Sequence, residues 1–219
     1  MDPAAADALR ETALVAFATF FATIGPLDVA IVFAGLAGGD RARDRRRIAV
    51  RAVAVATLIL LAFALFGEAA LGLFGVSMPA LRIAGGVLLL LIAVDLVFAR
   101  SSGGASTTPE ENAEAATRAD ITVFPLATPL IAGPGAIGAV VLLMGDARDD
   151  LLRGGAVIAA LLVTLGLTLA LMLLAGGVQR VLGRTGVHVV ARVFGVILAA
   201  LAVQFMLDGI AQSGLLGGS

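Results

Sequence analysis

Long apolar stretches, separated by shorter polar ones, run along most of the 219-residue chain. A helix needs about 20 apolar residues to cross the hydrocarbon core of a bilayer. Six stretches meet this requirement, at about residues 13–36, 48–66, 79–98, 121–144, 156–178 and 189–210. The pattern therefore predicts an all-α membrane protein with six transmembrane helices.

The composition supports this class and excludes several functions. Hydrophobic residues make up 60% of the chain and charged residues 14%, whereas a soluble domain is about 25% charged. No basic stripe suggests a nucleic-acid partner, so the expected surroundings are lipid. The chain has no Cys and a single His, His188, which excludes Cys/His metal sites and thiol chemistry. With no nucleophile beside a base either, we expect no enzyme activity, no catalytic residue, no cofactor and no metal.

The distribution of arginine predicts the orientation in the membrane. The loops after the first, third and fifth stretches carry ten arginines, and the opposite side carries four. Cytoplasmic loops are the Arg-rich ones, so both termini should face outward. The beginning of the chain, MDPAAADALRETAL, is acidic rather than basic and does not resemble a secretory signal peptide.

The two halves of the chain resemble each other. Gly25-Pro26 aligns with Gly133-Pro134 at an offset of 108 residues, and Arg82 aligns with Arg192 at an offset of 110. Three spans are an odd number, so the halves would enter the membrane from opposite sides, as in the inverted repeats of secondary transporters. We therefore predict a first repeat over 1–99, a flexible cytoplasmic linker over 100–120 and a second repeat over 121–219. Chance similarity between Ala-, Gly- and Leu-rich helices is the alternative.

The stretch PLATPLIAGPGAIG (125–138) places three prolines and three glycines inside an apolar span. A broken backbone is tolerated in a membrane only against protein or a water-filled cavity. A Gly-Pro break in the first and in the fourth span would begin a half-helix whose first amides are free to bind a carboxylate, and the preceding carbonyls would face an ammonium group. We expect Gly135, Ala136 and Ile137 to carry such amides, and glycine to admit only a small substrate. The predicted substrate-binding residues are Thr23, Gly25, Pro26, Asp28, Thr128, Gly133, Pro134, Gly135, Ala136 and Gln204. The alternative is that the prolines only kink packed helices.

Asp28 is the acid nearest to the middle of a span. An ionisable group there is costly and usually functional, so Asp28 could pair with a substrate ammonium or carry a proton. Its structural alternative is to cap the half-helix that begins at Pro26. For Gln204 the structural alternative is a hydrogen bond between helices, and Gly85, Gly86 and Gly195 are expected to allow close helix packing.

The chain resembles the MarC-like membrane proteins, which include the SnatA-type transporters of small neutral amino acids. The resemblance covers nearly all of the sequence and is most specific at PLATPLIAGPGAI (125–137), PALRIAGGVLLLLIAVDL (79–96) and GVILAALAVQFMLDGI (195–210). It implies a bacterial inner-membrane protein with six spans in two repeats, and glycine or alanine as substrate. The family usually has Asn-Pro, a small apolar residue and Gly in the first span. Here these positions are Gly25, Pro26, Leu27 and Asp28, which puts the same substrate and ion coupling in doubt.

The leading hypothesis is a secondary transporter of small neutral amino acids, with protons or sodium as candidate coupling ions and export as one of two directions. A transporter of another small solute, an intramembrane enzyme and a non-transporting scaffold are the alternatives. An enzyme lacks its catalytic groups here, and a scaffold has no need of uncharged helix breaks. The sequence does not specify the oligomeric state.

Overall fold

The computed structural model describes residues 3–37, 41–98, 122–174 and 183–214. The predicted linker, 100–120, lies outside these residues. Within them the chain is helical, and the helices are α1 (Pro3–Ile24), α2 (Pro26–Leu36), α3 (Ala42–Leu73), α4 (Met78–Phe98), η1 (Thr122–Ile131), α6 (Pro134–Asp146), α7 (Leu151–Leu173) and α9 (Gly183–Gln212).

The helices confirm the all-α prediction and the six spans. Five segments are long and apolar enough to cross a membrane, and the first of them runs through α1 and α2. The sixth span is the bent pair of η1 and α6, whose axes meet at 53°. Several helices extend beyond the apolar stretches, because α3 begins among arginines and α9 continues to Gln212. The first and fourth spans are the interrupted ones, as the glycine and proline positions predicted.

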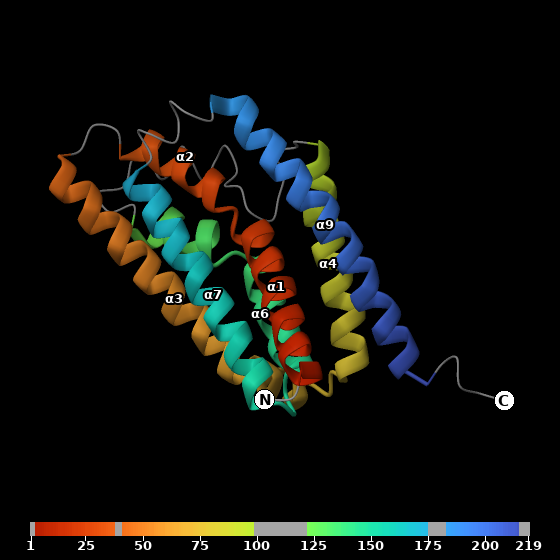
Figure 1. Ribbon diagram of the computed structural model, residues 1–219. Coiled ribbons are helices and arrows are strands. Elements are labelled where there is room, and N and C mark those ends of the chain that lie inside the picture. Colours follow the sequence, from red (N-terminus) through yellow and green to blue (C-terminus); the bar gives the residue numbers. More distant parts are fainter. Residues whose placement is uncertain (1–2, 38–40, 99–121, 175–182, 215–219) are drawn as a thin grey trace.

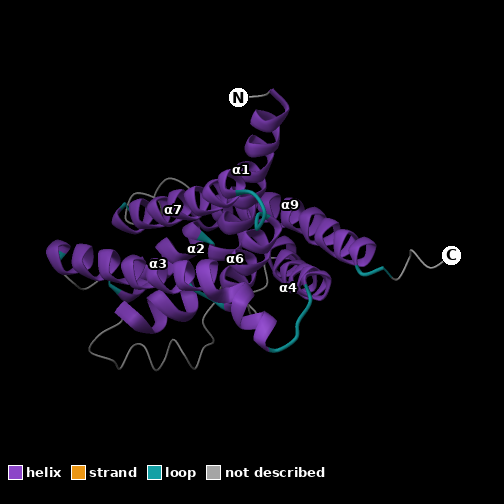
Figure 2. Ribbon diagram, turned by 90° about the horizontal axis from the view of Figure 1, so that it is seen from below, coloured by secondary structure: helices purple, strands orange, loops and turns teal. Residues whose placement is uncertain are grey.

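The two interrupted spans lie in the middle of the bundle (Figures 1 and 2), where α1 and α6 contact each other. The α3 and α7 helices flank this centre on one side, and the α4 and α9 pair flanks it on the other. α1 begins, α6 ends and α9 ends at the same end of the bundle, which we call the terminal end. Gly25, Pro26 and Gly133 are buried, whereas Thr128 and Pro134 are exposed, so the first break is enclosed in the bundle and the second is partly open at its surface.

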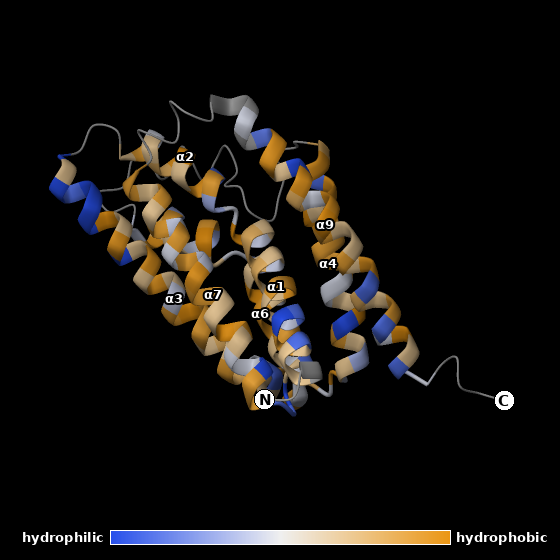
Figure 3. Cartoon of the chain, in the orientation of Figure 1, coloured by the Kyte–Doolittle hydropathy of each residue, from blue (hydrophilic) through white to orange (hydrophobic). Residues whose placement is uncertain are grey.

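The outer surface is apolar along the bundle, as a lipid-facing surface must be. Hydrophilic positions gather toward the helix ends, above all in the first turns of α3 and near the terminal end (Figure 3). Leu58 and Phe66 of α3 are 71% and 67% exposed. The interior is built from small and medium side chains, among them Ala16, Phe20 and Leu142, which are fully buried.

Glycines let α4 and α9 approach closely, which confirms the role expected for Gly86 and Gly195. A Cβ on Gly86 would lie 2.7 Å from the carbonyl oxygen of Ala202, and one on Gly195 would lie 2.9 Å from Cβ of Leu96. Real Cβ atoms do not come so close to other heavy atoms. Close helix packing through glycine is typical of membrane bundles, because dispersion contacts replace the hydrophobic effect in lipid.

Candidate functional site

The first break falls at Gly25, between α1 and α2. Gly25 has φ 61° and ψ 59°, in the left-handed region, which glycine adopts without the clash that a Cβ would cause. Pro26 is the first residue of α2, where its missing amide hydrogen costs nothing. The Gly-Pro sequence thus ends one half-helix and begins the next within two residues.

The second break is wider than the first and differs in geometry. Gly133 is extended, with φ −81° and ψ 169°, and α6 begins at Pro134. The half before it, η1, is an irregular helical segment with a kink. Phe124 and Thr128 leave helical geometry inside it. Each precedes a proline, and proline moves the preceding residue toward extended geometry.

The amides at the start of α6 correct one part of the prediction. The Ile137 amide donates to the Gly133 carbonyl over 3.0 Å and is not free. The Gly135 and Ala136 amides belong to the first turn, where a helix has no carbonyl partner of its own for them. No side chain caps the start of either α2 or α6. The amides without an intrahelical carbonyl partner at the second break are therefore those of Gly135 and Ala136, both buried residues.

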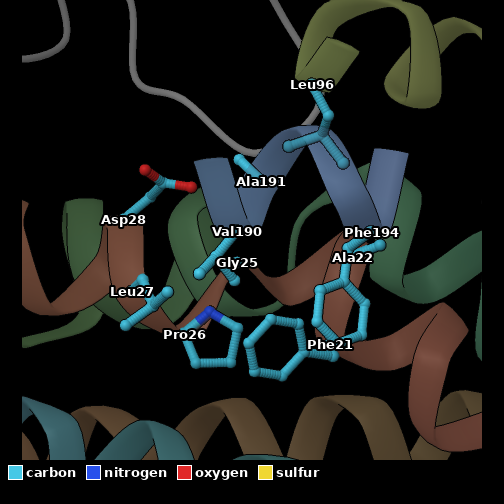
Figure 4. A pocket seen from close by; sticks show the side chains of 10 residues that line it. All are labelled: Phe21, Ala22, Gly25, Pro26, Leu27, Asp28, Leu96, Val190, Ala191 and Phe194. Carbon is cyan, nitrogen blue, oxygen red and sulfur yellow. The ribbon is translucent and has the colours of Figure 1, made fainter. Parts of the chain in front are cut away.

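A small hollow lies at the first break, and we call it the break hollow (Figure 4). Gly25, Pro26 and Asp28 line it together with residues of α4 and α9. The rings of Phe21 and Phe194 stand beside it with centroids 4.1 Å apart. The space in which the centre of a water molecule can lie has a volume of about 20 Å³. This is room for about one water molecule. In this conformation it is too small for an amino acid.

Asp28 is half-buried in the first turn of α2 and faces the break hollow. The cap residue of this helix is Gly25, and no side chain makes a capping hydrogen bond there. The cap predicted as the structural alternative for Asp28 is therefore absent as a hydrogen bond. His188, near the start of α9, interacts electrostatically with the carboxylate. The Asp28 carboxylate thus lies next to the first break and does not cap the start of α2.

The remaining predicted residues are spread over the bundle. Thr23 is buried beside the first break, and its hydroxyl donates to the Thr19 carbonyl over 2.8 Å. Thr128 is exposed at an extended position of η1. Gln204 bonds to Asp208 one turn along α9, over 2.8 Å, and not to another helix as its structural alternative expected. Residues of the second break line neither the break hollow nor the cavity described next.

A larger cavity opens near the terminal end between α1, α6, α7 and α9, and we call it the terminal cavity. It offers about 220 Å³ to the centres of water molecules. Its polar lining consists of Glu11, Thr12, Asp146, Arg153, Gln204 and Asp208. Only Gln204 of these was predicted as a site residue. The others lie near the ends of predicted spans, where polar side chains are ordinary, so no local pattern indicated that they would face one cavity.

Comparison with known proteins sets this architecture in a family. Residues 11–213 match the family described as MarC family integral membrane protein. The chain belongs to the MarC family. A UPF0056 membrane protein of Methanocaldococcus jannaschii is 41% identical over 197 residues, which cover 90% of this chain and 95% of that protein.

Other MarC relatives come from bacteria. The UPF0056 membrane protein YvbG of Bacillus subtilis is 34% identical over 89% of this chain and 92% of its own length. The UPF0056 inner membrane protein YhgN of Escherichia coli is 32% identical over 84% of this chain and 89% of its own length. No solved structure matches the chain. The relatives are named as membrane proteins, so the MarC family gives the location in a membrane and leaves the activity to be argued from the site.

Proposed function

We propose that this MarC protein is a secondary transporter of small neutral amino acids such as glycine and alanine, which bind at the two helix breaks. The observation that carries the proposal is that both interrupted spans lie in the protein interior and contact each other, α1 against α6 and α2 against η1. A break in a membrane span leaves backbone groups that lipid cannot satisfy. Interrupted spans that pack against each other inside the protein are typical of transporter substrate sites.

The chemistry of the second break suits a carboxylate. The Gly135 and Ala136 amides stand at the positive end of α6, equivalent to about half an elementary charge. Gly133, Gly135 and Ala136 are themselves small and buried, so a substrate with a small side chain fits best. Asp28 provides a negative charge at the first break for an ammonium group. Small neutral amino acids carry both charges and a small side chain.

Two packing relationships support an inverted repeat. α1 and α2 pack against α7, and η1 and α6 pack against α3, so the two halves exchange partners as a two-fold axis in the membrane plane requires. In the antiparallel α4–α9 interface, a Cβ on Gly86 would meet Met206, and one on Gly195 would meet Leu96. Leu96 and Met206 are 110 residues apart, and Gly86 and Gly195 are 109 apart, so the two contacts correspond to within one residue of the offset that aligns Arg82 with Arg192.

The test is flux of labelled glycine and alanine into and out of proteoliposomes. We expect saturable flux in the wild type and none in empty liposomes. Gly135→Leu should abolish it, because the added side chain blocks access to the amides. Gly166→Leu is the matched control, since Gly166 is an exposed glycine in the middle of α7 with open space around it. Full flux in Gly135→Leu would exclude the second break as the site. A protein that moves another small solute, or none, would favour the alternatives named above.

The same assay separates the candidate coupling ions. Flux in the presence of an imposed proton gradient is compared with flux in the presence of an imposed sodium gradient, each at the same membrane potential. Acceleration by one gradient identifies the ion. Orientation in the inner membrane with outward termini follows from the arginine distribution and is part of the proposal, with export and import as the two directions that the assay resolves.

A further inference from the structure

The terminal cavity differs from the break hollow in size and in chemistry. The volume open to the centres of water molecules is about 220 Å³ in the terminal cavity and about 20 Å³ in the break hollow. The first volume accommodates many water molecules, and thus a small amino acid with some of its hydration. A ligand could occupy the terminal cavity in the conformation described here, whereas the break hollow would first have to open.

The lining of the terminal cavity contains both acidic and basic side chains. Asp146 is already paired with Arg82, whose Nε donates to its carboxylate over 2.5 Å. Glu11 and Asp208 remain opposite Arg153 as the other charged residues of the lining. The lining therefore has carboxylates for an ammonium group and a guanidinium for a carboxylate, and both kinds of contact are charge-assisted hydrogen bonds.

Arg153 is an exposed residue of the lining that contacts a neighbouring helix. Its Nε donates to the Thr12 hydroxyl over 3.0 Å, which joins α7 to α1, and its charge also acts on Asp146. That bond does not use the two terminal nitrogens, and among the described residues Arg153 forms no ion pair within 4 Å. A planar guanidinium with its terminal nitrogens free binds a carboxylate through two parallel bonds.

The apolar part of the lining faces the same space. Val15, Leu143 and Val157 contribute to it from α1, α6 and α7. These groups would contact a hydrogen or methyl side chain without leaving a polar group unpaired. An inorganic cation would use the carboxylates but leave the guanidinium and the apolar surface without a role. The combination therefore favours a small zwitterion over an ion.

Thr19 lies along α1 between the terminal cavity and the first break, and it lines neither the terminal cavity nor the break hollow. Val15, Thr19 and Thr23 are four residues apart, and so lie on one face of the helix. Thr19 is fully buried, and its hydroxyl oxygen has no hydrogen-bond partner among the described residues. Other helical threonines donate to the carbonyl four residues earlier, namely Thr12, Thr23, Thr57, Thr164 and Thr168. A buried hydroxyl without a partner is costly, and a polar group passing along this face would satisfy it.

We propose that the terminal cavity is a second substrate site, on the path between the terminal end and the helix breaks. It binds a small zwitterionic amino acid with the carboxylate on Arg153 and the ammonium on Asp208 and Glu11. Thr19 then provides a hydroxyl partway along α1 between this site and the breaks. The inference rests on the proposed transport function and adds to it a site at which the substrate docks outside the breaks.

The first test is equilibrium binding of labelled alanine to the purified protein in lipid nanodiscs. Arg153→Gln and Asp208→Asn should each weaken binding by about tenfold or more, since each removes a charge-assisted contact. Arg148→Gln is the control, because Arg148 lies at the same end of the bundle but bonds to Glu68 over 2.6 Å and is outside the lining. Melting temperatures of all variants show whether they fold. Thr19→Val should retain alanine binding and lower the flux in proteoliposomes.

The second test uses the absence of cysteine from the natural chain. A single cysteine is placed at Gln204, which lines the terminal cavity, or at Asp149, which is exposed between α6 and α7 outside the lining. A cationic, membrane-impermeant thiol reagent should label both, and alanine should slow the labelling of Gln204→Cys. Alanine should leave the labelling rate of Asp149→Cys unchanged.

The outcomes separate the two proposals. Alanine binding that is unchanged in Arg153→Gln and Asp208→Asn, with no protection of Gln204→Cys, would overturn the second site and leave transport at the breaks standing. Wild-type protein that neither binds nor moves any small neutral amino acid would overturn the transport proposal, and the assigned ligand of the terminal cavity with it. Loss of binding in both charge variants, with protection of Gln204→Cys, supports the second site, and saturable flux in proteoliposomes is the separate support for transport.

Discussion

Arg82 of α4 and Asp146, the last residue of α6, form an ion pair in which Nε lies 2.5 Å from Oδ1. Their side chains are only 15% and 22% exposed, and the Nη1 atom of Arg82 is buried without a partner among the described residues. The pair joins a helix of the first half of the chain to a helix of the second half. It therefore fixes the two halves together at the terminal end, beside the terminal cavity.

Arg82→Gln should destabilise the protein, because it leaves the Asp146 carboxylate largely buried and without its cation. Breaking a fully buried pair costs about 3–5 kcal/mol, and partial exposure at this end of the bundle reduces the expected loss to about 1–3 kcal/mol. Thermal unfolding in detergent measures it. Arg148→Gln breaks the more exposed pair with Glu68 and should cost less than about 1 kcal/mol. Equal losses in the two variants would contradict the difference in burial.

Gly86→Ala should separate α4 from α9. The new Cβ would lie 2.6 Å from Cγ of Met206 and 2.7 Å from the Ala202 carbonyl oxygen, and a backbone atom cannot rotate away as a side chain can. Overpacking of this kind typically costs about 1–3 kcal/mol. Gly166→Ala, in open space on α7, should be neutral or gain up to about 1 kcal/mol from helix propensity. A Gly86→Ala protein that melts at the wild-type temperature would show that the helices can shift without cost.

Asp28→Asn separates the roles of the acid at the first break. Because no side chain caps α2, we expect a melting temperature close to that of the wild type. Substrate affinity should fall about tenfold or more if Asp28 pairs with the ammonium. If Asp28 carries a proton, affinity should persist while the response of flux to a proton gradient disappears. We expect altered flux, and a variant with wild-type affinity and wild-type flux at every pH would leave Asp28 without a transport role.

The orientation can be read by labelling single cysteines in intact cells. Asp149→Cys, exposed between α6 and α7, should react with an impermeant thiol reagent from outside. Arg43→Cys, exposed at the start of α3, should react only after the membrane is permeabilised. The natural chain has no cysteine, so it gives no background. The reverse pattern would show inward-facing termini and contradict the arginine rule for this chain.

The sequence by itself determined the fold class, the six spans and the positions of both breaks. Hydrophobic length fixes the spans, because a bilayer imposes one thickness on every crossing helix. Pro26 and Pro134 fix the starts of α2 and α6, because proline restricts its own backbone and removes a donor wherever it stands. Gly86 and Gly195 could be assigned to close packing for a similar reason, since a missing Cβ is a local property.

Some local features were predicted only in part from the sequence. A proline restricts the residue before it, and Phe124 and Thr128, which each precede a proline, leave helical geometry inside η1. This irregularity was not predicted, although the proline positions allowed it. The Ile137 amide was expected to be free, but it lies one residue beyond the free amides of the first turn and donates to the Gly133 carbonyl. Gln204 was expected to bond across helices, but Asp208 lies one turn away on the same helix and is the nearer partner.

Only the tertiary structure decided which polar side chains share a cavity. Glu11, Arg153 and Asp208 come from three helices far apart in the sequence, and nothing local relates them. The same holds for Arg82 and Asp146, which pair over 64 positions of the chain. The size of each cavity is likewise a tertiary property, because it depends on the side chains of several helices at once. Periodicity and turn chemistry act over a few residues, whereas a binding site depends on how whole helices pack.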